Sequence, residues 1–191
     1  PFFVGRYLRS VQNGESPQWL RNRLLSIGLN PISALVDITN YLTFDRARPL
    51  HVFDADKLSG GLTVRRSVEG EKFHALDDKI YELNEGMIVI TDEKEIVSLG
   101  GIIGGMKSAV SDETKNVLLE AAYFDPISIA ATGRKLQINS DARYRFERGV
   151  DPSFTLSGSH IATKMILDLC GGEASDIIIA GSVPSLSLIH I

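Results

Sequence analysis

The spacing of apolar residues predicts a strand followed by two helices at the start of the chain. Residues 1–11, PFFVGRYLRSV, have the apolar density of a strand. Ser16 and Pro17 are residue types that begin helices, and Gly28 ends the helical spacing that follows them. The apolar positions of this first helix are Trp19, Leu20, Leu24 and Ile27. After Pro31, helical spacing predicts a second helix with an apolar side made of Ile32, Leu35, Val36 and Leu42.

The middle of the chain has the pattern of short strands separated by turn residues. We expect a loop from Pro49 to Gly61, followed by strands in the segments LTVRR, KIYEL, GMIVI and EIVSL. Gly, Asp and Asn between these segments predict an antiparallel meander. The segment NVLLEAAYFDP, from Asn116 to Pro126, has the composition of a buried strand.

Two more helices and a last strand complete the predicted elements. Pro126 begins a helix to about Leu136, and Pro152 begins a longer one to about Leu169. Gly171 and Gly172 end the longer helix, and DIIIA follows as a strand. The buried side of the longer helix is expected to carry Leu156, Ile161, Met165, Ile166 and Leu169. The final SLSLIHI does not fit the pattern, and we leave it out as vector-derived sequence or a trailing linker.

The stretch NSDARYRFERGVDP, from Asn139 to Pro152, combines unusual residue types. Tyr144 and Phe146 alternate with arginines, which predicts a short strand that turns at Gly149. One interpretation is a charged edge hairpin. The arginines have acids within reach, so we expect them to form local ion pairs that serve mostly the structure. The arginines are Arg143, Arg145 and Arg148, and the acids are Asp141, Glu147 and Asp151.

Composition narrows the possible classes of protein. A chain of 191 residues can bury a core as one domain or as two small fused domains. No apolar run is long enough to cross a membrane, and the opening residues, which begin at Pro1 as in a fragment, do not resemble a signal peptide. The single Cys170 and the scattered histidines indicate a reducing cytoplasm and speak against a structural metal. A net charge of -4 argues against tight autonomous binding to nucleic acid.

Three features are unusual for purely structural segments. Glu120 interrupts an apolar strand, so its carboxylate must be paired, exposed on the other face, or used in function. The glycines of SLGGIIGG, residues 98–105, let the backbone approach a ligand or another strand, or simply form turns, and their spacing is not that of a phosphate loop. Asp37, Thr39 and Asn40 lie within the predicted second helix, where such side chains compete for backbone hydrogen bonds.

Five motifs occur in one order: VDITNY, PLHVFDADKL, SLGGIIGG, NVLLEAAYFDP and NSDARYRFERGVDP. Their order and spacing resemble the B3/B4 region of the bacterial phenylalanyl-tRNA synthetase β subunit. The resemblance implies an α+β fold with a mixed, largely antiparallel β-sheet core and flanking helices. It divides the chain into a leading strand segment, 1–15, the B3/B4 editing domain, 16–180, and an unassigned tail, 181–191.

The resemblance implies a proofreading module that hydrolyses the ester of tyrosine mischarged onto tRNA(Phe). An apolar synthetic pocket rejects a substrate with one added hydroxyl by only about a hundredfold, so a second site must favour that hydroxyl. By resemblance, Glu120 matches the glutamate that receives the tyrosine hydroxyl, with an amide near Gly101 as a second contact. His51 matches the family's editing-site histidine, and both are expected to be catalytic-site residues.

Other residues are assigned to substrate binding by the same resemblance. Gly104 and Ala142 line the pocket, Ser140 stands where many members have threonine, and Thr39 and Asn40 lie near the ester or the amino group. Hydrolysis by a positioned water is expected, because no nucleophile with an adjacent base stands out in the sequence. His51 orients that water or acts as its base, and the sequence leaves both roles open.

The expected partners are the tyrosine-carrying 3′ end of tRNA(Phe), the α subunit and the remaining β-subunit domains of an α2β2 assembly, with no membrane. No cofactor or metal is expected in this domain, whereas the parent enzyme uses ATP and Mg²⁺. Asn30 stands where many relatives have arginine, so the local anchoring that an arginine would give is in doubt.

The alternative function is a non-catalytic assembly or tRNA-guiding module with a decayed editing pocket. The isolated fragment is expected to be weakly active or inactive. A standalone RNA-binding domain is disfavoured by the acidic balance.

Overall fold

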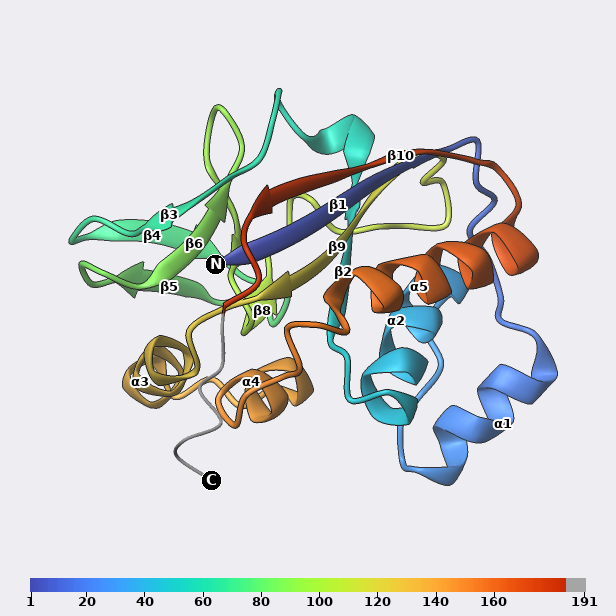
Figure 1. Cartoon of the computed structure of the whole chain (residues 1–191), viewed down its shortest axis with the longest axis horizontal. Coiled ribbons are helices and arrows are strands. Elements are labelled where there is room, and N and C mark those ends of the chain that lie inside the picture. Colours follow the sequence, from blue (N-terminus) through green and yellow to red (C-terminus); the bar gives the residue numbers. More distant parts are fainter. Residues whose placement is uncertain (185–191) are drawn as a thin grey trace.

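Two four-stranded antiparallel sheets form the frame of the protein, for which a computed structural model describes residues 1–184. The first sheet has the strand order β10-β1-β9-β2 and the second has the order β3-β6-β7-β8, while β4 and β5 form a separate hairpin (Figure 1). The first sheet consists of β1 (Phe2–Arg9), β2 (Leu50–Asp54), β9 (Val117–Tyr123) and β10 (Glu173–Gly181). The second consists of β3 (Thr63–Arg66), β6 (Ile88–Thr91), β7 (Ile96–Leu99) and β8 (Ile103–Gly104), and the hairpin of β4 (Glu71–His74) and β5 (Ile80–Leu83).

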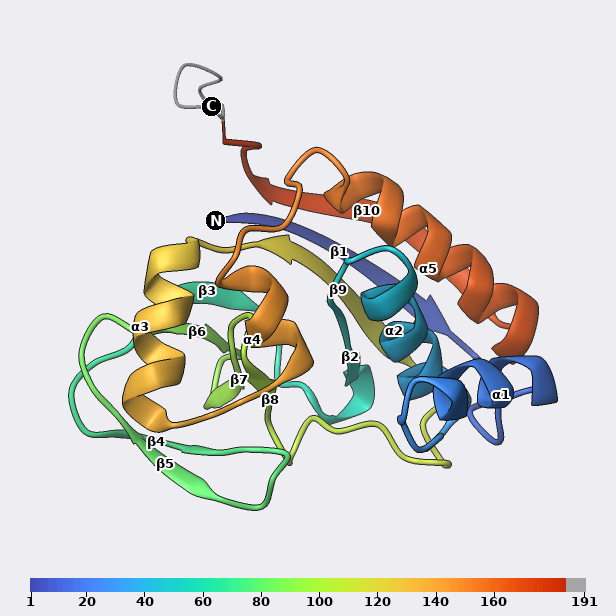
Figure 2. The same cartoon turned by 90° about the horizontal axis from the view of Figure 1, so that it is seen from below.

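Helices cover one face of the first sheet. α2 (Ala34–Asp45) and α5 (Thr155–Cys170) pack on that face and on each other, and α1 (Gln18–Ser26) packs on α2 (Figure 2). α3 (Pro126–Leu136) and α4 (Asp141–Phe146) lie instead beside the second sheet. Among the described residues, no helix has the length and apolar composition needed to cross a bilayer.

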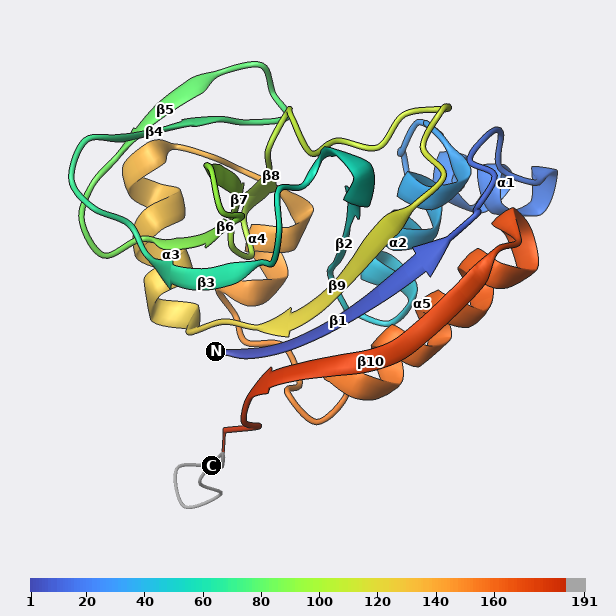
Figure 3. The ribbon, with the colours of Figure 1, turned by 90° about the horizontal axis from the view of Figure 1, so that it is seen from above.

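The opposite face of the first sheet packs toward the second sheet. Side chains alternate between the two faces of a strand, so Leu118, Glu120 and Ala122 of β9 point to this face. Leu118 and Ala122 join the core that contains Phe53 of β2 and the buried side chains of β6 and β7. Figure 3 shows β10, β1, β9 and β2 side by side, with the second sheet next to β9 and β2. Glu120 is therefore a carboxyl group that points into the space between two sheets.

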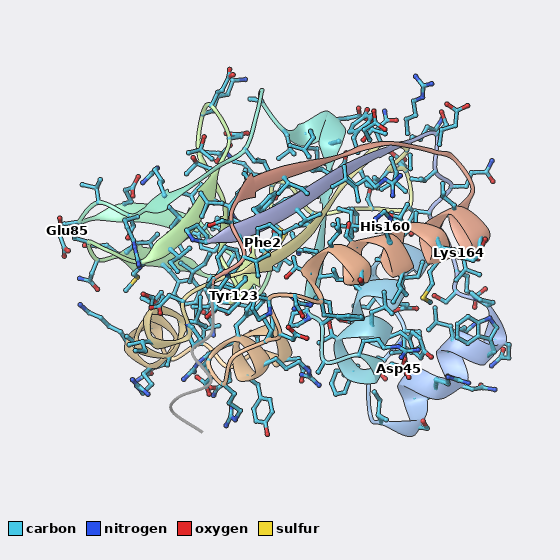
Figure 4. The ribbon with its side chains drawn as sticks, viewed as in Figure 1. Phe2, Asp45, Glu85, Tyr123, His160 and Lys164 are labelled. Carbon is cyan, nitrogen blue, oxygen red and sulfur yellow. The ribbon has the colours of Figure 1, made fainter. Side chains whose placement is uncertain are left out.

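Four of the side chains labelled in Figure 4 show which parts of the molecule are buried and which are exposed. Phe2 and Tyr123, which face each other across β1 and β9, lie side by side near the middle of the molecule. Glu85 lies at the turn before β6, and Lys164 lies on the outer side of α5, where it is exposed. Phe2 is thus buried and Tyr123 partly buried, whereas Glu85 and Lys164 are exposed to solvent.

The α+β class is confirmed, as are most of the predicted elements. The opening strand, both N-terminal helices, the strand around Glu120 and the helix after Pro126 are all present. The four predicted short strands are present as β3, β5, β6 and β7, although β3 pairs with β6 and the β4–β5 hairpin stands apart. The strands are therefore not a simple sequential meander. The tail SLSLIHI lies outside the described residues.

The predicted short strand between Asn139 and Gly149 is wrong, because this stretch forms α4. The Ser140 hydroxyl caps the helix by accepting a hydrogen bond from the Arg143 amide at 3.0 Å. Ion pairs at i,i+4 spacing, Arg143–Glu147 and Arg145–Asp141, then connect successive turns. These local interactions outweigh the alternation of arginine and aromatic residues, while the turn at Gly149 is confirmed by its φ of 88°.

The predicted loop from Pro49 to Gly61 is also wrong at its start. Residues 50–54 form β2, which pairs with β9 from Leu50 opposite Ala121 to Asp54 opposite Val117. A 3-10 turn, Ala55–Lys57, follows and is capped by the Asp54 side chain. The five-residue strand has too few residues to give a clear alternation, and its pairing with a distant strand decides its conformation.

Three smaller predictions need correction. Pro17, not Ser16, is the N-cap of α1, since the Ser16 hydroxyl donates instead to the buried Asp37 carboxylate at 2.6 Å. α5 begins at Thr155, after Pro152, and its Leu156 is 37% exposed. Ile32 precedes α2 and is 72% exposed, so the buried side of that helix is formed by its later apolar residues.

Replacing Ile38 by alanine should lower the free energy of unfolding by about 2–5 kcal/mol, because the side chain is fully buried between α2 and the first sheet. The matched control, Ile32→Ala, removes the same atoms from an exposed position and should change stability by less than about 0.5 kcal/mol. Urea denaturation followed by circular dichroism measures both. Equal losses for the two variants would contradict the burial pattern of α2.

Candidate active site

A cavity of about 330 Å³ lies between the first sheet, the β7–β8 turn and α4. It brings together residues that are far apart in the sequence. Seven of the eight residues expected to form the site line it: Asn40, His51, Gly101, Gly104, Glu120, Ser140 and Ala142. The remaining lining residues are Pro49, Leu50, Leu76, Ser98, Ile102, Ile103, Asp141 and Phe146.

Glu120 lies on the inner strand β9, between β1 and β2. Its neighbours across the two ladders are Gly5 and His51. Side chains of cross-strand partners share a face of the sheet, so Glu120 and His51 stand next to each other while Gly5 adds no side chain. A Cβ at Gly5 would lie 3.3 Å from the Phe3 ring, which therefore occupies the space beside the carboxyl group. Glu120 is only 6% exposed in this setting.

The Glu120 carboxyl group has an unsatisfied oxygen. Among the described residues, no hydrogen-bond partner is present for its buried Oε2. Burial raises the pKa of Glu120 from 4.5 to about 8, because the ionised form loses its hydration. The carboxyl group is therefore protonated near neutral pH, and it can both donate and accept a hydrogen bond at the cavity.

His51 is held in its neutral form by the same dry surroundings. Burial lowers the pKa of His51 from 6.5 to about 4, so the imidazole is uncharged at neutral pH. Its ring meets Phe53 edge-on, with centroids 4.5 Å apart, and its Nε2 has no partner among the described residues. A Cβ at Gly104 would lie 2.7 Å from this Nε2. Any side chain at position 104 would thus displace the imidazole, which gives a physical reason for glycine there.

Ser140 connects α4 to the glycine-rich turn. Its hydroxyl donates to the Ile102 carbonyl at 2.6 Å and also caps α4. Gly101 has a φ of 71°, and a Cβ there would lie 3.0 Å from Phe124 and 3.1 Å from Phe146. The turn therefore depends on glycine at 101 and on the serine that fixes it to α4, and Ala142 follows in α4 as a small residue beside the cavity.

The structure separates the two polar residues of the TNY motif. Asn40 lines the cavity, whereas Thr39 is buried elsewhere and donates to the Val36 carbonyl at 2.7 Å. The neighbouring Asp37 accepts hydrogen bonds from the Ser16 hydroxyl and the Ile32 amide. Asp37 and Thr39 thus stabilise the start of α2, and only Asn40 reaches the site.

Several lining residues were not identified from the sequence. Leu76 lies in the turn between β4 and β5, far in sequence from the other site residues. Phe146 lies one helical turn after Ala142, at the end of α4. Ser98 lies on β7 and donates a hydrogen bond to the Ile103 carbonyl at 3.3 Å. Its place at the start of the glycine-rich segment was the one available signal. In the sequence, nothing distinguishes the apolar residues that line the cavity from ordinary core residues.

The arrangement provides neutral hydrogen-bonding groups inside an otherwise mostly apolar cavity. Serine, histidine and acid side chains do not form a nucleophile–base chain here, since the Ser140 hydroxyl donates to a backbone carbonyl. Cys170, the last residue of α5, lies in the core, where burial raises the pKa of its thiol to about 11. Within residues 1–184, no three side chains of His, Cys, Asp or Glu gather closely enough to hold a metal ion. The polar groups that line the cavity can bind and orient a polar ligand.

Comparison with known proteins identifies the family of this chain. The model of the B3/4 domain matches residues 1–171. The chain is 59% identical over 187 residues to the phenylalanine–tRNA ligase β subunit of Ruegeria pomeroyi and 60% identical over 183 residues to that of Rhodospirillum rubrum. It covers 23% of the length of each of these proteins.

A solved N-terminal fragment of the phenylalanyl-tRNA synthetase β subunit from Pyrococcus horikoshii has a similar fold. The TM-score is 0.55 at 13% identity, over 95% of this chain and 51% of that one. At this identity the likeness supports the fold alone.

Between pH 6.5 and 8 the free energy of unfolding should fall as pH rises. Glu120, with its pKa raised to about 8, keeps its proton in the folded chain, whereas an unfolded glutamate is ionised. The folded state therefore binds more protons in this window, and the stability it gains is lost as pH rises through the folded pKa. His51, with its pKa lowered to about 4, is neutral in both states above pH 6.5 and contributes little there.

Urea titrations at pH 6.5 and pH 8 measure this dependence. The matched variant Glu120→Gln cannot ionise, so its stability should decline much less over the same interval. An equal decline in the two proteins would show that the Glu120 carboxyl group is not the cause.

Proposed function

The chain belongs to the B3/4 domain family, and on that premise we propose that it is the editing domain of a phenylalanine–tRNA ligase β subunit. In this proposal the domain hydrolyses the ester that joins tyrosine to the 3′ end of tRNA(Phe). The observation that carries it is the buried Glu120, whose free oxygen lies in a mostly apolar cavity.

The chemical difference between tyrosine and phenylalanine is a single hydroxyl group. A tyrosine hydroxyl reaching Glu120 can donate to its free oxygen or accept its proton, and either bond satisfies the carboxyl group. Phenylalanine leaves the buried group unsatisfied, at a cost of about 1–3 kcal/mol. That cost corresponds to roughly 5- to 150-fold discrimination against phenylalanine. The site therefore has the preference opposite to that of an apolar synthetic pocket.

The cavity also has room for the amino acid. Its volume of about 330 Å³ lies in the range of small-ligand pockets, and Phe146, Ile102 and Ile103 supply apolar surface for a ring. Ala142 adds only a methyl group at the edge of this space. The Gly101 amide has no acceptor among the described residues, so it is available as a second donor near the substrate.

For the hydrolytic step we assign His51 the role of orienting a water molecule. A base works best with a pKa near the working pH, and the pKa of about 4 makes the His51 imidazole a weak proton acceptor. Its unpaired Nε2 can still accept a hydrogen bond from water and hold it near the ester. An aminoacyl ester is already activated, so a held water and a donor to the developing oxyanion suffice for attack. The water oxygen bonds to the carbonyl carbon, and the ribose hydroxyl leaves with a proton.

The proposal extends to the enzyme of which this chain would be a part. That enzyme would use ATP and Mg²⁺ for aminoacylation, and the α subunit and other β-subunit domains would deliver the tRNA end. A tRNA-guiding module with a decayed pocket is less well supported, because Glu120, His51 and Ala142 all remain around one cavity.

Filling the cavity tests the proposal directly. In the complete ligase, Ala142→Trp should reduce deacylation of tyrosyl-tRNA(Phe) by about a hundredfold or more, because the indole occupies the space for the tyrosine ring. Aminoacylation with phenylalanine serves as the control and should be retained. A native enzyme that does not release tyrosine faster than buffer does would reject the editing function.

Two further substitutions separate recognition from hydrolysis. Glu120→Ala should lower the ratio of tyrosyl to phenylalanyl ester hydrolysis by roughly tenfold, because it removes the hydroxyl partner. His51→Ala should slow both esters by about the same factor and leave their ratio intact, since the water is common to both. Single-turnover deacylation of the two esters measures each effect. A changed ratio in His51→Ala, or an unchanged ratio in Glu120→Ala, contradicts the assigned roles.

A further inference from the structure

A second cavity, of about 370 Å³, is lined by an unusual number of arginines. Four of its lining residues are arginines, and Asp151 is the only acid among them. The complete lining is Arg46, Ala47, Arg48, Tyr144, Arg145, Arg148, Gly149, Val150, Asp151 and Phe154. We call it the arginine cavity.

The arginine cavity adjoins the candidate active site along two segments of chain. Residues 46–48 lead directly into residues 49–51, which line the active site. On α4, Ala142 lines the active site and Tyr144 lines the arginine cavity two residues later. The two cavities therefore share the segment 46–51 and α4 as walls, so the arginine cavity is placed beside the path of a polymer whose end enters the active site.

Arg48 forms the fixed wall of the arginine cavity. It is 1% exposed and donates to the Ala122 carbonyl of β9 at 2.9 Å and to the Asp151 carbonyl. Its buried Nε has no partner among the described residues. Burial lowers the pKa of Arg48 to about 10, so the guanidinium remains charged at neutral pH. A buried cation with an unused donor favours an anionic ligand.

The outer wall combines guanidinium groups with exposed aromatic rings. Tyr144 is 57% exposed, and the Arg148 guanidinium lies 3.7 Å from the centre of its ring. Phe44 is not a lining residue, but it is 36% exposed and its ring centre lies 4.3 Å from the guanidinium of the lining residue Arg145. Stacked pairs of this kind are the surfaces on which single-stranded nucleic acids place their bases.

The charge distribution distinguishes this cavity from its neighbours. The acids that pair with Arg46, Arg145 and Arg148 are Asp45, Asp141 and Glu147, and none of them lines the arginine cavity. By contrast, a cavity of about 420 Å³ beside β3 and β7 has a mixed lining, with the acids Glu71, Asp92, Glu93 and Glu95 and the basic residues Arg65, Lys72 and Lys94. The chain as a whole carries a charge of -4, so the positive surface is local.

We propose that the arginine cavity binds the phosphodiester backbone of the single-stranded RNA end whose terminal ester enters the active site. Arg46 and Arg148 contact the phosphates at its mouth, Arg48 anchors the wall, and Tyr144 stacks on a base. The inference rests on the proposed editing function for the identity of the RNA, and it adds the residues that hold that RNA.

The test uses Arg46→Gln and Arg148→Gln, because both side chains are more than half exposed, at 57% and 54%. Arg134→Gln, on the exposed surface of α3 and outside the described cavities, is the matched control. Arg148→Lys keeps the charge and serves as the conservative variant. All are made in the complete ligase.

Two substrates separate RNA contacts from ester chemistry. Tyrosyl-tRNA(Phe) carries the phosphates, and 3′-O-tyrosyl adenosine does not. In the double variant of Arg46 and Arg148, kcat/KM for the tRNA should fall at least tenfold more than kcat/KM for the nucleoside ester, mainly through KM. The salt dependence of the tRNA reaction should weaken by about 0.7 in slope for each lost phosphate contact. Arg148→Lys should recover most of the loss, and Arg134→Gln should behave like the native enzyme.

Equal losses of kcat/KM on both substrates would mean a structural role for these arginines. No loss on the tRNA would mean no contact, so either result overturns the inference.

A direct binding assay keeps the inference separate from the editing proposal. A fluorescent single-stranded RNA ending in CCA should bind the native ligase more tightly than the double variant, with Arg134→Gln as control. This difference would support the RNA contact even if no ester were hydrolysed, and its absence would overturn the contact even if hydrolysis were normal.

Discussion

The pairing register between β2 and β9 is the constraint on which the candidate active site depends. In this register His51 stands opposite Glu120, and both side chains point into the space between the two sheets. A shift by one residue would turn each side chain to the opposite face, where α2 and α5 pack. β9 has a strand on each side, so Glu120 has no route to bulk water through a sheet edge. The raised pKa of its carboxyl group is a direct consequence of that enclosure.

Two glycines let other groups lie close to this enclosed pair. Gly5 has no side chain beside Glu120, so the Phe3 ring occupies that space, and Gly104 lets the backbone of β8 lie against the His51 ring. The turn between β7 and β8 is closed by the Ile102 amide, which donates to the Leu99 carbonyl, and the Ser140 hydroxyl adds a bond to the Ile102 carbonyl from α4. Because the same hydroxyl caps α4, the helix and the turn hold the cavity wall together. A single serine thus joins local helix formation to the shape of the site.

The two neighbouring cavities differ in the charge of their polar side chains. The active-site cavity contains Glu120 and His51 in neutral form, because desolvation there opposes charge. The arginine cavity keeps its charges, since Arg46 and Arg148 are largely in solvent and Arg48 is tied to two carbonyl groups. Selection of one hydroxyl group benefits from a dry site where an unmet hydrogen bond is costly. Attraction of a phosphate chain benefits from solvated, mobile cations.

The sequence by itself determined the elements whose signals are local. Pro126 and the paired glycines at 171 and 172 mark helix ends through backbone geometry, and the apolar run around Glu120 has the composition of a buried strand. The motifs together also identified the family and seven residues that line the cavity. These inferences succeeded because each rests on neighbours in the chain or on a shared order of motifs.

Only the tertiary structure decided the rest. The short segment 50–54 becomes a strand because β9 offers it a partner, and Thr39 differs from Asn40 because the turn of α2 points them to different surroundings. Arg46 and Arg48 meet Arg145 and Arg148 across about a hundred residues of sequence, and no local pattern encodes that meeting. Burial, which sets the pKa values of Glu120 and His51, is likewise a property of packed layers, since it depends on which distant side chains exclude water.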